Sequence, residues 1–197
     1  MDLQISVFLL FILFTAGHSL SCYECMSATG SCADQKLKTC PIESSQCKSS
    51  TSVAQVGDSI LKAKNCVPAC QSGSLNLGTS KTTYSCCTTD QCNLQDAPDP
   101  SNVPNGKTCY TCDVQSCSTI LNCLGDEDRC VTVTATSVGQ SISVKGCASK
   151  SICGTTASVH GIGSISCCEG NLCNGDQSVS QSFLFLCCSL LSYFLLH

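Results

Sequence analysis

The clearest alternation of hydrophobic and polar residues lies in the second half of the chain. In Val131 to Val144, which reads VTVTATSVGQSISV, Val and Ala alternate with Thr, and Ile and Val resume the alternation after a glycine. This period of two predicts two strands with one hydrophobic face, and Gly139-Gln140 can form the two-residue turn between them. A less regular copy lies in the first half, where Gly57-Asp58 separates residues 48–56 from residues 59–65. The pattern therefore predicts β-hairpins, and neither half contains a convincing amphipathic helix.

The body of the chain is poor in large hydrophobic residues. All six phenylalanines lie in the two terminal segments, and the chain contains no tryptophan. Between residues 20 and 175, Leu, Ile and Val occupy 26 of 156 positions, about 17%, which is below the roughly 20% expected of a chain that buries an ordinary core. Cysteine, in contrast, accounts for 22 of 197 residues. Disulfides formed in an oxidising compartment must therefore replace apolar burial as the main source of stability.

Charge and motifs exclude several classes of function. The net charge is −4, so the chain lacks the basic surplus of a nucleic-acid-binding protein. His160 is the one histidine between the two terminal segments, and no nucleophile motif accompanies it. The carboxylates of residues 126–128 are adjacent rather than alternating, which predicts a solvated acidic turn and not a calcium loop. In an oxidising compartment the CxxC pairs favour disulfides over redox or zinc sites. We therefore expect no catalytic residue, cofactor or metal.

Residues 1–19 are interpreted as a signal peptide. Ile5 to Thr15 reads ISVFLLFILFT, an apolar run too short to span a bilayer. Gly17 and Ser19 fit the small positions of a cleavage site before Leu20. The n-region departs from the usual pattern, because it contains Asp2 and no Lys or Arg. The alternative is a buried N-terminal strand, but the cysteine-rich body requires export in any case.

Residues 175–197 are interpreted as a glycosylphosphatidylinositol (GPI) attachment signal that is removed. The tail after residue 183 reads FLFLCCSLLSYFLLH, which is short of the roughly 20 residues of a spanning helix, and no Lys or Arg follows it. Small residues and a polar stretch precede this tail, as in GPI signals. The six-residue spacer, 177–182, is shorter than the usual length of roughly 8–12.

The attachment residue is predicted to be Gly175, with Asn174 and Ser178 as alternatives. Two other interpretations of the tail stay open. One is a secreted chain with an apolar end, and the other is a short membrane anchor with acylated Cys187 and Cys188. If the GPI interpretation is right, these two cysteines are removed with the tail.

The remaining twenty cysteines form two sets of ten. Each set opens with a C-Y-x-C motif, CYEC at 22–25 and CYTC at 109–112, and closes with CC-x4-CN, CCTTDQCN at 86–93 and CCEGNLCN at 167–174. Matching ends on two blocks of similar length indicate a duplication. The predicted domains are residues 20–94 and 108–174. Residues 95–107, QDAPDPSNVPNGK, hold three of the five prolines and are predicted to be a partly extended linker.

This pattern resembles the lymphocyte antigen 6 / urokinase receptor (LU) family of three-finger domains over residues 20–174. The resemblance implies an all-β, disulfide-rich fold of two tandem three-finger (LU) domains, each with three hairpins extending from a disulfide hub. It also implies that Asn93 and Asn174 fasten the domain ends by hydrogen bonds to the backbone. The family's pairing order, carried over, gives Cys22–Cys47, Cys25–Cys32, Cys40–Cys66, Cys70–Cys86, Cys87–Cys92, Cys109–Cys130, Cys112–Cys117, Cys123–Cys147, Cys153–Cys167 and Cys168–Cys173.

The expected function is that of a non-enzymatic, GPI-anchored protein of the cell surface with a binding, adhesive, receptor-like or epithelial-coat role. Its expected partners are the outer leaflet of the plasma membrane, through the lipid, and an extracellular or cell-surface protein. One alternative is a soluble enzyme inhibitor similar to the two-domain serum phospholipase inhibitors. Another is a receptor modulator, although the middle finger, residues 48–65, has Lys62 and Lys64 but no Arg or aromatic residue.

Overall fold

The computed structural model describes residues 19–57, 59–113, 116–137, 140–154 and 164–175. Most of the predicted signal peptide and tail, together with His160, Ser178, Cys187 and Cys188, lie outside these ranges. Within them the chain is almost entirely β. No helix in this described part has the length and apolar character needed to cross a bilayer.

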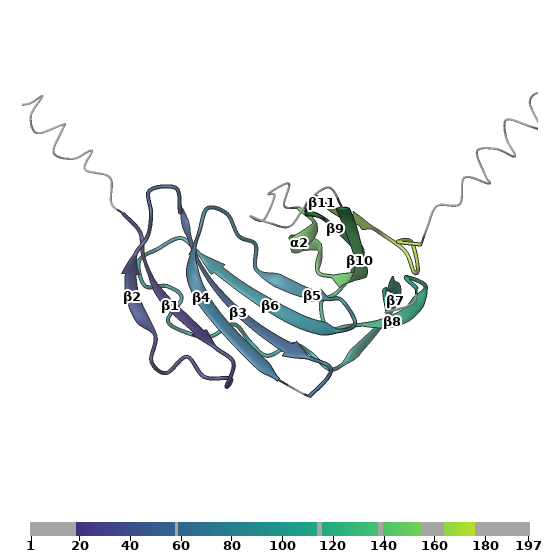
Figure 1. Cartoon of the computed structure of the whole chain (residues 1–197), viewed down its shortest axis with the longest axis horizontal. Coiled ribbons are helices and arrows are strands. Elements are labelled where there is room, and N and C mark those ends of the chain that lie inside the picture. Colours follow the sequence, from purple (N-terminus) through teal and green to yellow (C-terminus); the bar gives the residue numbers. More distant parts are fainter. Residues whose placement is uncertain (1–18, 58, 114–115, 138–139, 155–163, 176–197) are drawn as a thin grey trace, which may run out of the picture.

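The described residues form six strands in the first half, five in the second half and one short helix (Figure 1). The strands of the first half are β1 (Ser21–Ser27), β2 (Lys36–Thr39), β3 (Gln46–Ala54), β4 (Ile60–Val67), β5 (Gly73–Asn76) and β6 (Ser80–Cys87). Those of the second half are β7 (Pro104–Thr111), β8 (Thr119–Leu124), β9 (Arg129–Ser137), β10 (Gln140–Ala148) and β11 (Ser164–Cys168), with helix α2 (Lys150–Cys153) before β11.

Nine of these strands form one sheet that continues through both halves of the molecule. Its order is β11-β9-β10-β5-β6-β3-β4-β1-β2, and β7 and β8 form a separate two-stranded sheet. The halves meet where β10 pairs with β5 in antiparallel register, Cys147 opposite Asn76 and Ala148 opposite Leu75. Figure 1 shows the resulting curved sheet, with α2 and β11 above this contact and β7 and β8 to its right.

The predicted hairpin of the second half is present, but its turn is displaced. Gln140 begins β10 and pairs with Ser137, so the predicted turn at Gly139-Gln140 is wrong by one residue. The register moves by two pairing positions, and an even shift keeps side chains on the same face. Val144 therefore lies opposite Val133, where the predicted turn would have placed it opposite Ala135, and the hydrophobic face is preserved.

The buried interior consists of small clusters rather than one large core. Two clusters are made chiefly of half-cystines, around Cys22, Cys40 and Cys47 in one half and around Cys109, Cys123, Cys130 and Cys147 in the other. The third cluster is aliphatic and centres on Val131, Val133, Ala148 and Ile152. This distribution agrees with the low hydrophobic content of the body of the chain, because sulfur replaces aliphatic carbon in the interior.

Candidate functional site: the joint between the two domains

Two disulfide hubs position the strands on either side of the molecule. Among the described residues ten disulfides are present, and they join Cys22–Cys47, Cys25–Cys32, Cys40–Cys66, Cys70–Cys86, Cys87–Cys92, Cys109–Cys130, Cys112–Cys117, Cys123–Cys147, Cys153–Cys167 and Cys168–Cys173. In each hub two bridges pack sulfur against sulfur, with 3.2 Å between Cys22 and Cys40 and 3.3 Å between Cys109 and Cys123. These sulfurs are all oxidised, so they offer no thiolate to a metal ion.

One asparagine closes each hub. Asn93 accepts a hydrogen bond from the Tyr23 amide at 2.8 Å and donates to the Tyr23 carbonyl at 2.9 Å. Asn174 makes the same pair of bonds with Tyr110, at 2.9 Å each. Each side chain also donates to a carbonyl of a second strand, β3 in one domain and β9 in the other. Both asparagines are buried, and each side chain hydrogen-bonds the loop after the last cysteine of its domain to the backbone of that domain's first strand.

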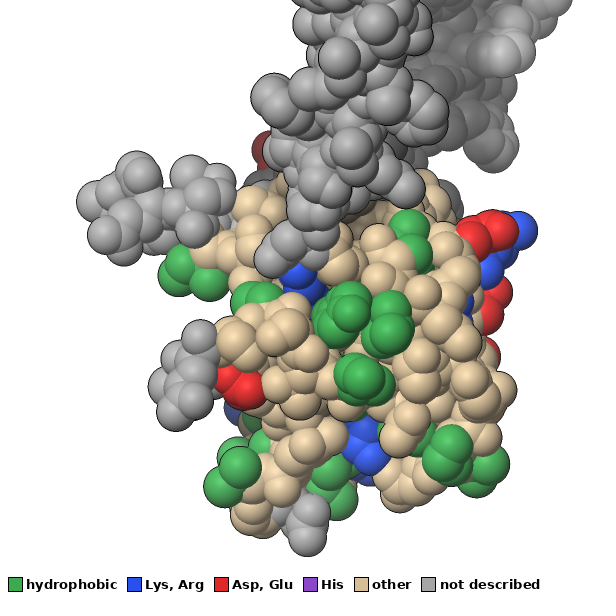
Figure 2. Space-filling view, turned by 90° about the vertical axis from the view of Figure 1, so that its right-hand side faces the viewer, with side chains coloured by type: hydrophobic (Ala, Val, Ile, Leu, Met, Phe, Trp, Pro, Cys, Tyr) green, Lys and Arg blue, Asp and Glu red, His purple; other side chains and the backbone are tan. Residues whose placement is uncertain are grey.

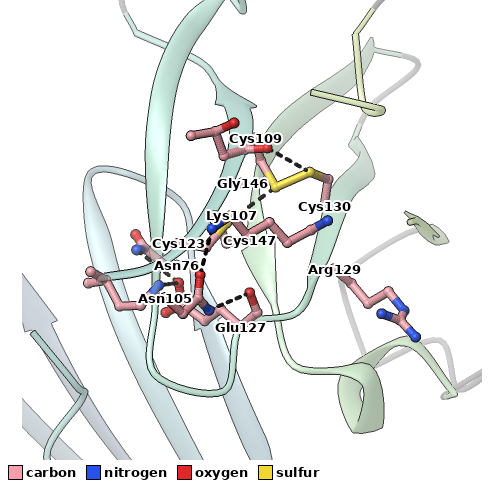
Figure 3. The surroundings of a disulfide bond; sticks show 12 residues. Asn76, Asn105, Lys107, Cys109, Cys123, Glu127, Arg129, Cys130, Gly146 and Cys147 are labelled. Atoms are coloured by element: carbon pink, nitrogen blue, oxygen red, sulfur yellow. Dashed lines mark hydrogen bonds between the residues drawn. A yellow bond between two sulfur atoms is a disulfide. The ribbon is translucent and has the colours of Figure 1, made fainter. Parts of the chain in front are cut away.

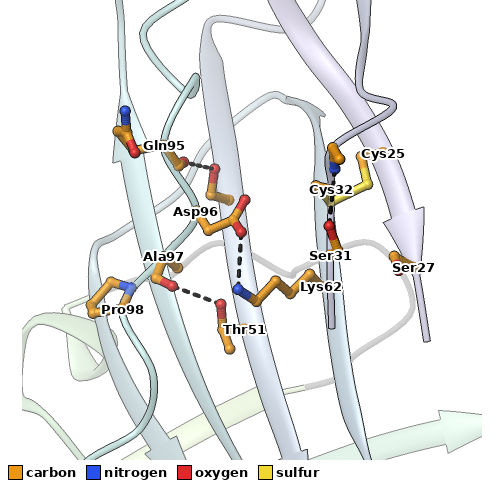
Figure 4. A network of polar contacts seen from close by, with 12 residues as sticks. Cys25, Ser27, Ser31, Cys32, Thr51, Lys62, Gln95, Asp96, Ala97 and Pro98 are labelled. Carbon is orange, nitrogen blue, oxygen red and sulfur yellow. Dashed lines mark hydrogen bonds and ion pairs between the residues drawn. A yellow bond between two sulfur atoms is a disulfide. The ribbon is translucent and has the colours of Figure 1, made fainter. Parts of the chain in front are cut away.

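The segment after Asn93 lies along the first domain instead of extending freely. Ala97 is 2% exposed, although it falls within the predicted linker. Hydroxyl groups of β3 and β6 donate to three carbonyls of this segment, and Figure 4 shows those that accept from β3, at Gln95 and Ala97. The bonds run from Ser49 to Gln95 at 3.1 Å, from Thr51 to Ala97 at 2.7 Å, and from Thr83 to Pro98. The end of the predicted linker, from Pro104 onward, belongs to β7.

Two lysines of the middle finger hold this segment through Asp96. Lys62 and Lys64 each lie 2.9 Å from a different oxygen of the Asp96 carboxylate. Burial alone would raise the pKa of Asp96, but hydrogen bonds from Lys64 and Lys62 outweigh it and lower the pKa below its ordinary value. Lys64 is 3% exposed and also donates to Gln35 and to the Leu94 carbonyl, at 2.6 Å each. These two charges are therefore used inside the domain and are not presented to a receptor.

The joint between the domains is made by β5, β10 and the turn at residues 124–128. Backbone pairing is extended by Ser149, whose amide donates to the Ser74 carbonyl at 3.0 Å and whose hydroxyl accepts from the Ser74 amide at 3.0 Å. The strands approach so closely at Gly146 that a Cβ atom there would lie 2.0 Å from the Asn76 carbonyl oxygen. Only glycine fits this contact, because no real Cβ comes that close to a backbone oxygen.

The middle residue of the acidic turn, Glu127, is buried in the joint, whereas Asp126 and Asp128 are exposed, so the prediction of a solvated turn is wrong at Glu127 alone. Glu127 is 3% exposed, and its carboxylate accepts hydrogen bonds from the Leu124 amide at 2.8 Å and from the Asn76 side chain at 3.3 Å. Asp126 accepts a bond of 2.5 Å from the Ser74 hydroxyl. Figure 3 shows Glu127 next to Asn76 of the first domain and below the Cys109, Cys123, Cys130 and Cys147 hub of the second.

Burial changes the acidity of Glu127. Loss of solvation raises the pKa of this carboxyl to about 6 from an ordinary value of 4.5, against the opposing effect of its hydrogen bonds to Leu124 and Asn76. The negative charge of Asp126 raises the pKa further, and the positive charge of Lys81 lowers it. A carboxyl that is partly protonated near neutral pH is therefore placed between the two domains.

An aliphatic cluster completes the joint on the other face of the sheet. Leu75, Leu77 and Tyr84 of the first domain pack against the buried cluster around Val131 of the second. The ammonium group of Lys48 lies 4.7 Å from the centre of the Tyr84 ring. Burial raises the pKa of Tyr84 and lowers that of Lys48. The domains thus share both a polar and an apolar contact.

Sequence reasoning did not identify the first domain's side of the joint. The residues GSLNL at 73–77 do alternate small or polar with leucine, and this pattern is a strand signal. The polar members, Ser74 and Asn76, are nevertheless buried, at 7% and 0% exposure. Burial of the polar face depends on the partner strand β10, which no local pattern reveals.

Comparison with known proteins also divides the chain into two consecutive regions of one family. Residues 20–93 and 108–174 each match the sequence profile of the family described as snake toxin and toxin-like protein. The chain is 30% identical to the urokinase plasminogen activator surface receptor of Rattus norvegicus, over 90% of this chain and 62% of that receptor. It is 28% identical to the receptor of the same name from Mus musculus, over 82% and 56% respectively. The chain thus spans about three fifths of the length of these relatives. With its two disulfide hubs and eleven strands in the described residues, the chain belongs to the three-finger family of snake toxin and toxin-like proteins.

Proposed function

We propose that the protein is a receptor-like binding protein of the cell surface, anchored by a GPI lipid at Gly175 and without catalytic activity of its own. It would present its two LU domains as one rigid unit to an extracellular or cell-surface protein. The observation that carries this proposal is the continuous pairing of β5 with β10, because it gives two small domains a single fixed geometry. The named relatives are surface receptors, which supports the same class of function.

The outer surface carries exposed apolar side chains of the kind that protein interfaces use. Large hydrophobic side chains are exposed on both domains and on the segment between them, including Met26 at 81%, Val56 at 89%, Val103 at 70% and Ile120 at 61%. Figure 2 shows hydrophobic side chains gathered near the middle of the face at the second-domain end, with Lys or Arg side chains above and below them. Apolar side chains surrounded by polar surface are typical of contact sites for protein partners.

The anchor is tested by treating intact cells with phosphatidylinositol-specific phospholipase and probing with antibody to the second domain. We expect the treatment to release the processed protein, which ends at the lipid-bearing Gly175, from the cells. The matched control is a chain that ends after Ser182, which lacks the apolar tail and should appear in the medium without treatment. Protein that stays on the cell after treatment would support the short membrane anchor instead. Full-length protein already in the medium would support a soluble inhibitor.

The binding role is tested with the released protein coupled to fluorescent beads, which are then applied to cells. We expect the beads to bind, and we expect binding to be lost when the cells are first treated with trypsin. The variant Gly146→Ala should bind less because it disturbs the joint, whereas Gly154→Ala, whose added Cβ has its nearest contact at 3.6 Å, should bind normally. Equal binding by the two variants would show that the fixed geometry of the domains is not used.

A further inference from the structure

Asn105 and Gly106 lie in a β-bulge of β7, beside the joint. The register of β7 against β8 shifts between Pro104 and Thr108, so its paired positions skip residues 105–107. Both residues of the Asn-Gly pair are exposed. Gly106 has a φ of 86°, and a Cβ atom placed on it would have nothing within 4 Å. The backbone nitrogen of Gly106 is therefore within reach of water and is not shielded by a side chain.

Three hydrogen bonds hold the Asn105 side chain between this bulge and the acidic turn. Its amide nitrogen donates to the carbonyl oxygens of Gly125 and Glu127, at 3.1 Å each. Its oxygen accepts from the Lys107 amide at 2.9 Å, and Figure 3 shows Asn105 close to Glu127. A bond from a side-chain oxygen to the amide two residues on is an Asx turn. This turn brings the side-chain carbonyl carbon toward the nitrogen of Gly106, and the bond from Lys107 draws electrons away from that carbon.

We propose that Asn105 is a site of spontaneous deamidation and that this modification loosens the joint. The Gly106 nitrogen attacks the side-chain carbonyl carbon of Asn105, loses its proton and displaces ammonia, which leaves a five-membered cyclic imide. Water then opens the imide at either carbonyl, and the product is aspartate or isoaspartate at residue 105. The net change is the hydrolysis of one amide to a carboxylate and ammonium, without oxidation or reduction. This inference goes beyond the proposed receptor role and does not rest on the anchor.

The product no longer supports the acidic turn. A carboxylate only accepts hydrogen bonds, so the carbonyl groups of Gly125 and Glu127 lose this donor. The reaction also adds a negative charge next to a turn that already contains Asp126 and Glu127. Because Glu127 accepts the bond from Asn76 across the joint, displacement of the turn weakens the contact between the domains.

The second Asn-Gly pair of the chain, Asn174-Gly175, serves as an internal comparison. Asn174 is 6% exposed. The Gly175 amide donates to the Leu172 carbonyl at 3.2 Å, and a Cβ atom on Gly175 would lie 3.0 Å from the Tyr110 ring. The nitrogen needed for attack is thus hydrogen-bonded and crowded, and its asparagine is enclosed by the hub. We expect Asn105 to react in the folded protein and Asn174 to stay intact.

The first test is incubation of the disulfide-bonded protein, purified from cells, in mildly alkaline buffer at body temperature. The protein is then digested with pepsin at acidic pH, and the peptides are analysed by mass spectrometry. We expect residue 105 to be converted severalfold faster than residue 174. The control is the reduced protein unfolded in urea, in which both Asn-Gly pairs are free and should be converted at similar rates.

The second test measures hydrogen exchange where β5 pairs with β10. In Asn105→Asp the amides of residues 75–76 and 147–148 should exchange severalfold faster than in the original protein. The matched control is Asn102→Asp, because the Asn102 side-chain oxygen accepts a bond from Lys81 that a carboxylate also accepts. If Asn105→Asp fails to fold, protein aged in the first test provides the same measurement, because it folds before the modification occurs.

The outcomes separate the modification from its effect on the joint. If Asn105 in the folded protein is converted no faster than Asn174, the modification site is overturned. If exchange is unchanged in both the aged protein and Asn105→Asp, the proposed loosening of the joint is overturned. Equally fast exchange in Asn102→Asp would overturn the role assigned to the Asn105 hydrogen bonds, because added charge alone would then explain the result.

Discussion

Replacement of Glu127 by glutamine should make the protein more stable at neutral pH and should remove part of its pH dependence. The Glu127 carboxyl is buried in the joint, and one of its oxygens accepts bonds from the Leu124 amide and the Asn76 side chain. The glutamine amide oxygen can accept the same two bonds without carrying a charge. Glu127→Gln therefore imitates the protonated acid and removes the cost of burying the ionised form.

The size of the expected change in unfolding free energy follows from the pKa of Glu127. A rise from 4.5 to about 6 corresponds to up to about 2 kcal/mol of unfolding free energy. Because the folded protein binds this proton more tightly than the unfolded chain, the contribution is present in full below pH 4.5. It is lost as the pH rises through about 6. Between pH 4.5 and neutral pH, the unfolding free energy of the original protein should thus fall by about 1–2 kcal/mol because of Glu127. The unfolding free energy of Glu127→Gln should not show this fall.

The assay is urea unfolding of the disulfide-bonded protein between pH 4 and pH 8, followed by far-ultraviolet circular dichroism. We expect Glu127→Gln to be about 1–2 kcal/mol more stable than the original protein at pH 7 and equally stable below pH 4.5. Glu24→Gln is the matched control, because the Glu24 side chain is 48% exposed and pairs with Lys38 at the surface. A Glu127→Gln variant that keeps the pH dependence of the original protein would refute the reasoning.

Three further changes test the joint and the hubs. Gly146→Ala should cost about 1–3 kcal/mol through its clash with the Asn76 carbonyl, and should split unfolding into two transitions, whereas Gly154→Ala should leave a single transition. Asn174→Asp should lower the unfolding free energy by about 3 kcal/mol in thermal unfolding, because a carboxylate oxygen would face carbonyl groups that now accept from the amide. Cys40→Ser opens a bridge with a sequence separation of 26, a loss of about 3.5 kcal/mol, and should be retained before the surface when surface and total antibody staining are compared. Normal surface staining of that variant would contradict the dependence on the hub.

The parts of the fold that sequence alone predicted are those fixed by covalent or local constraints. The two CC-x4-CN ends place the asparagines that close the hubs, since each asparagine directly follows the last cysteine of its set. The alternation at residues 131–137 predicted β9 because side chains in a strand alternate between faces. The turn after β9 was misplaced because more than one two-residue turn in this segment keeps the hydrophobic face intact.

The parts that sequence did not predict depend on contacts between distant residues. Glu127 stands between two aspartates, and such a run is usually solvated, yet its partner Asn76 lies 51 positions earlier in the chain. In the same way, Asp96 in the proline-rich segment reaches Lys62, 34 positions earlier. Local composition carries no information about such pairs, so the burial of Glu127 and the attachment of the segment after Asn93 become visible only in the structure.

The chemistry of the joint implies that the two domains depend on each other. If the domains separated, Asn76, Ser74 and the β10 edge would lose partners that only the other domain supplies. Buried polar groups without partners are costly, so the closed arrangement is favoured even though the apolar contact around Tyr84 is small. A hinge would need water to replace these bonds at every opening. The joint therefore acts as a rigid coupling between the two domains.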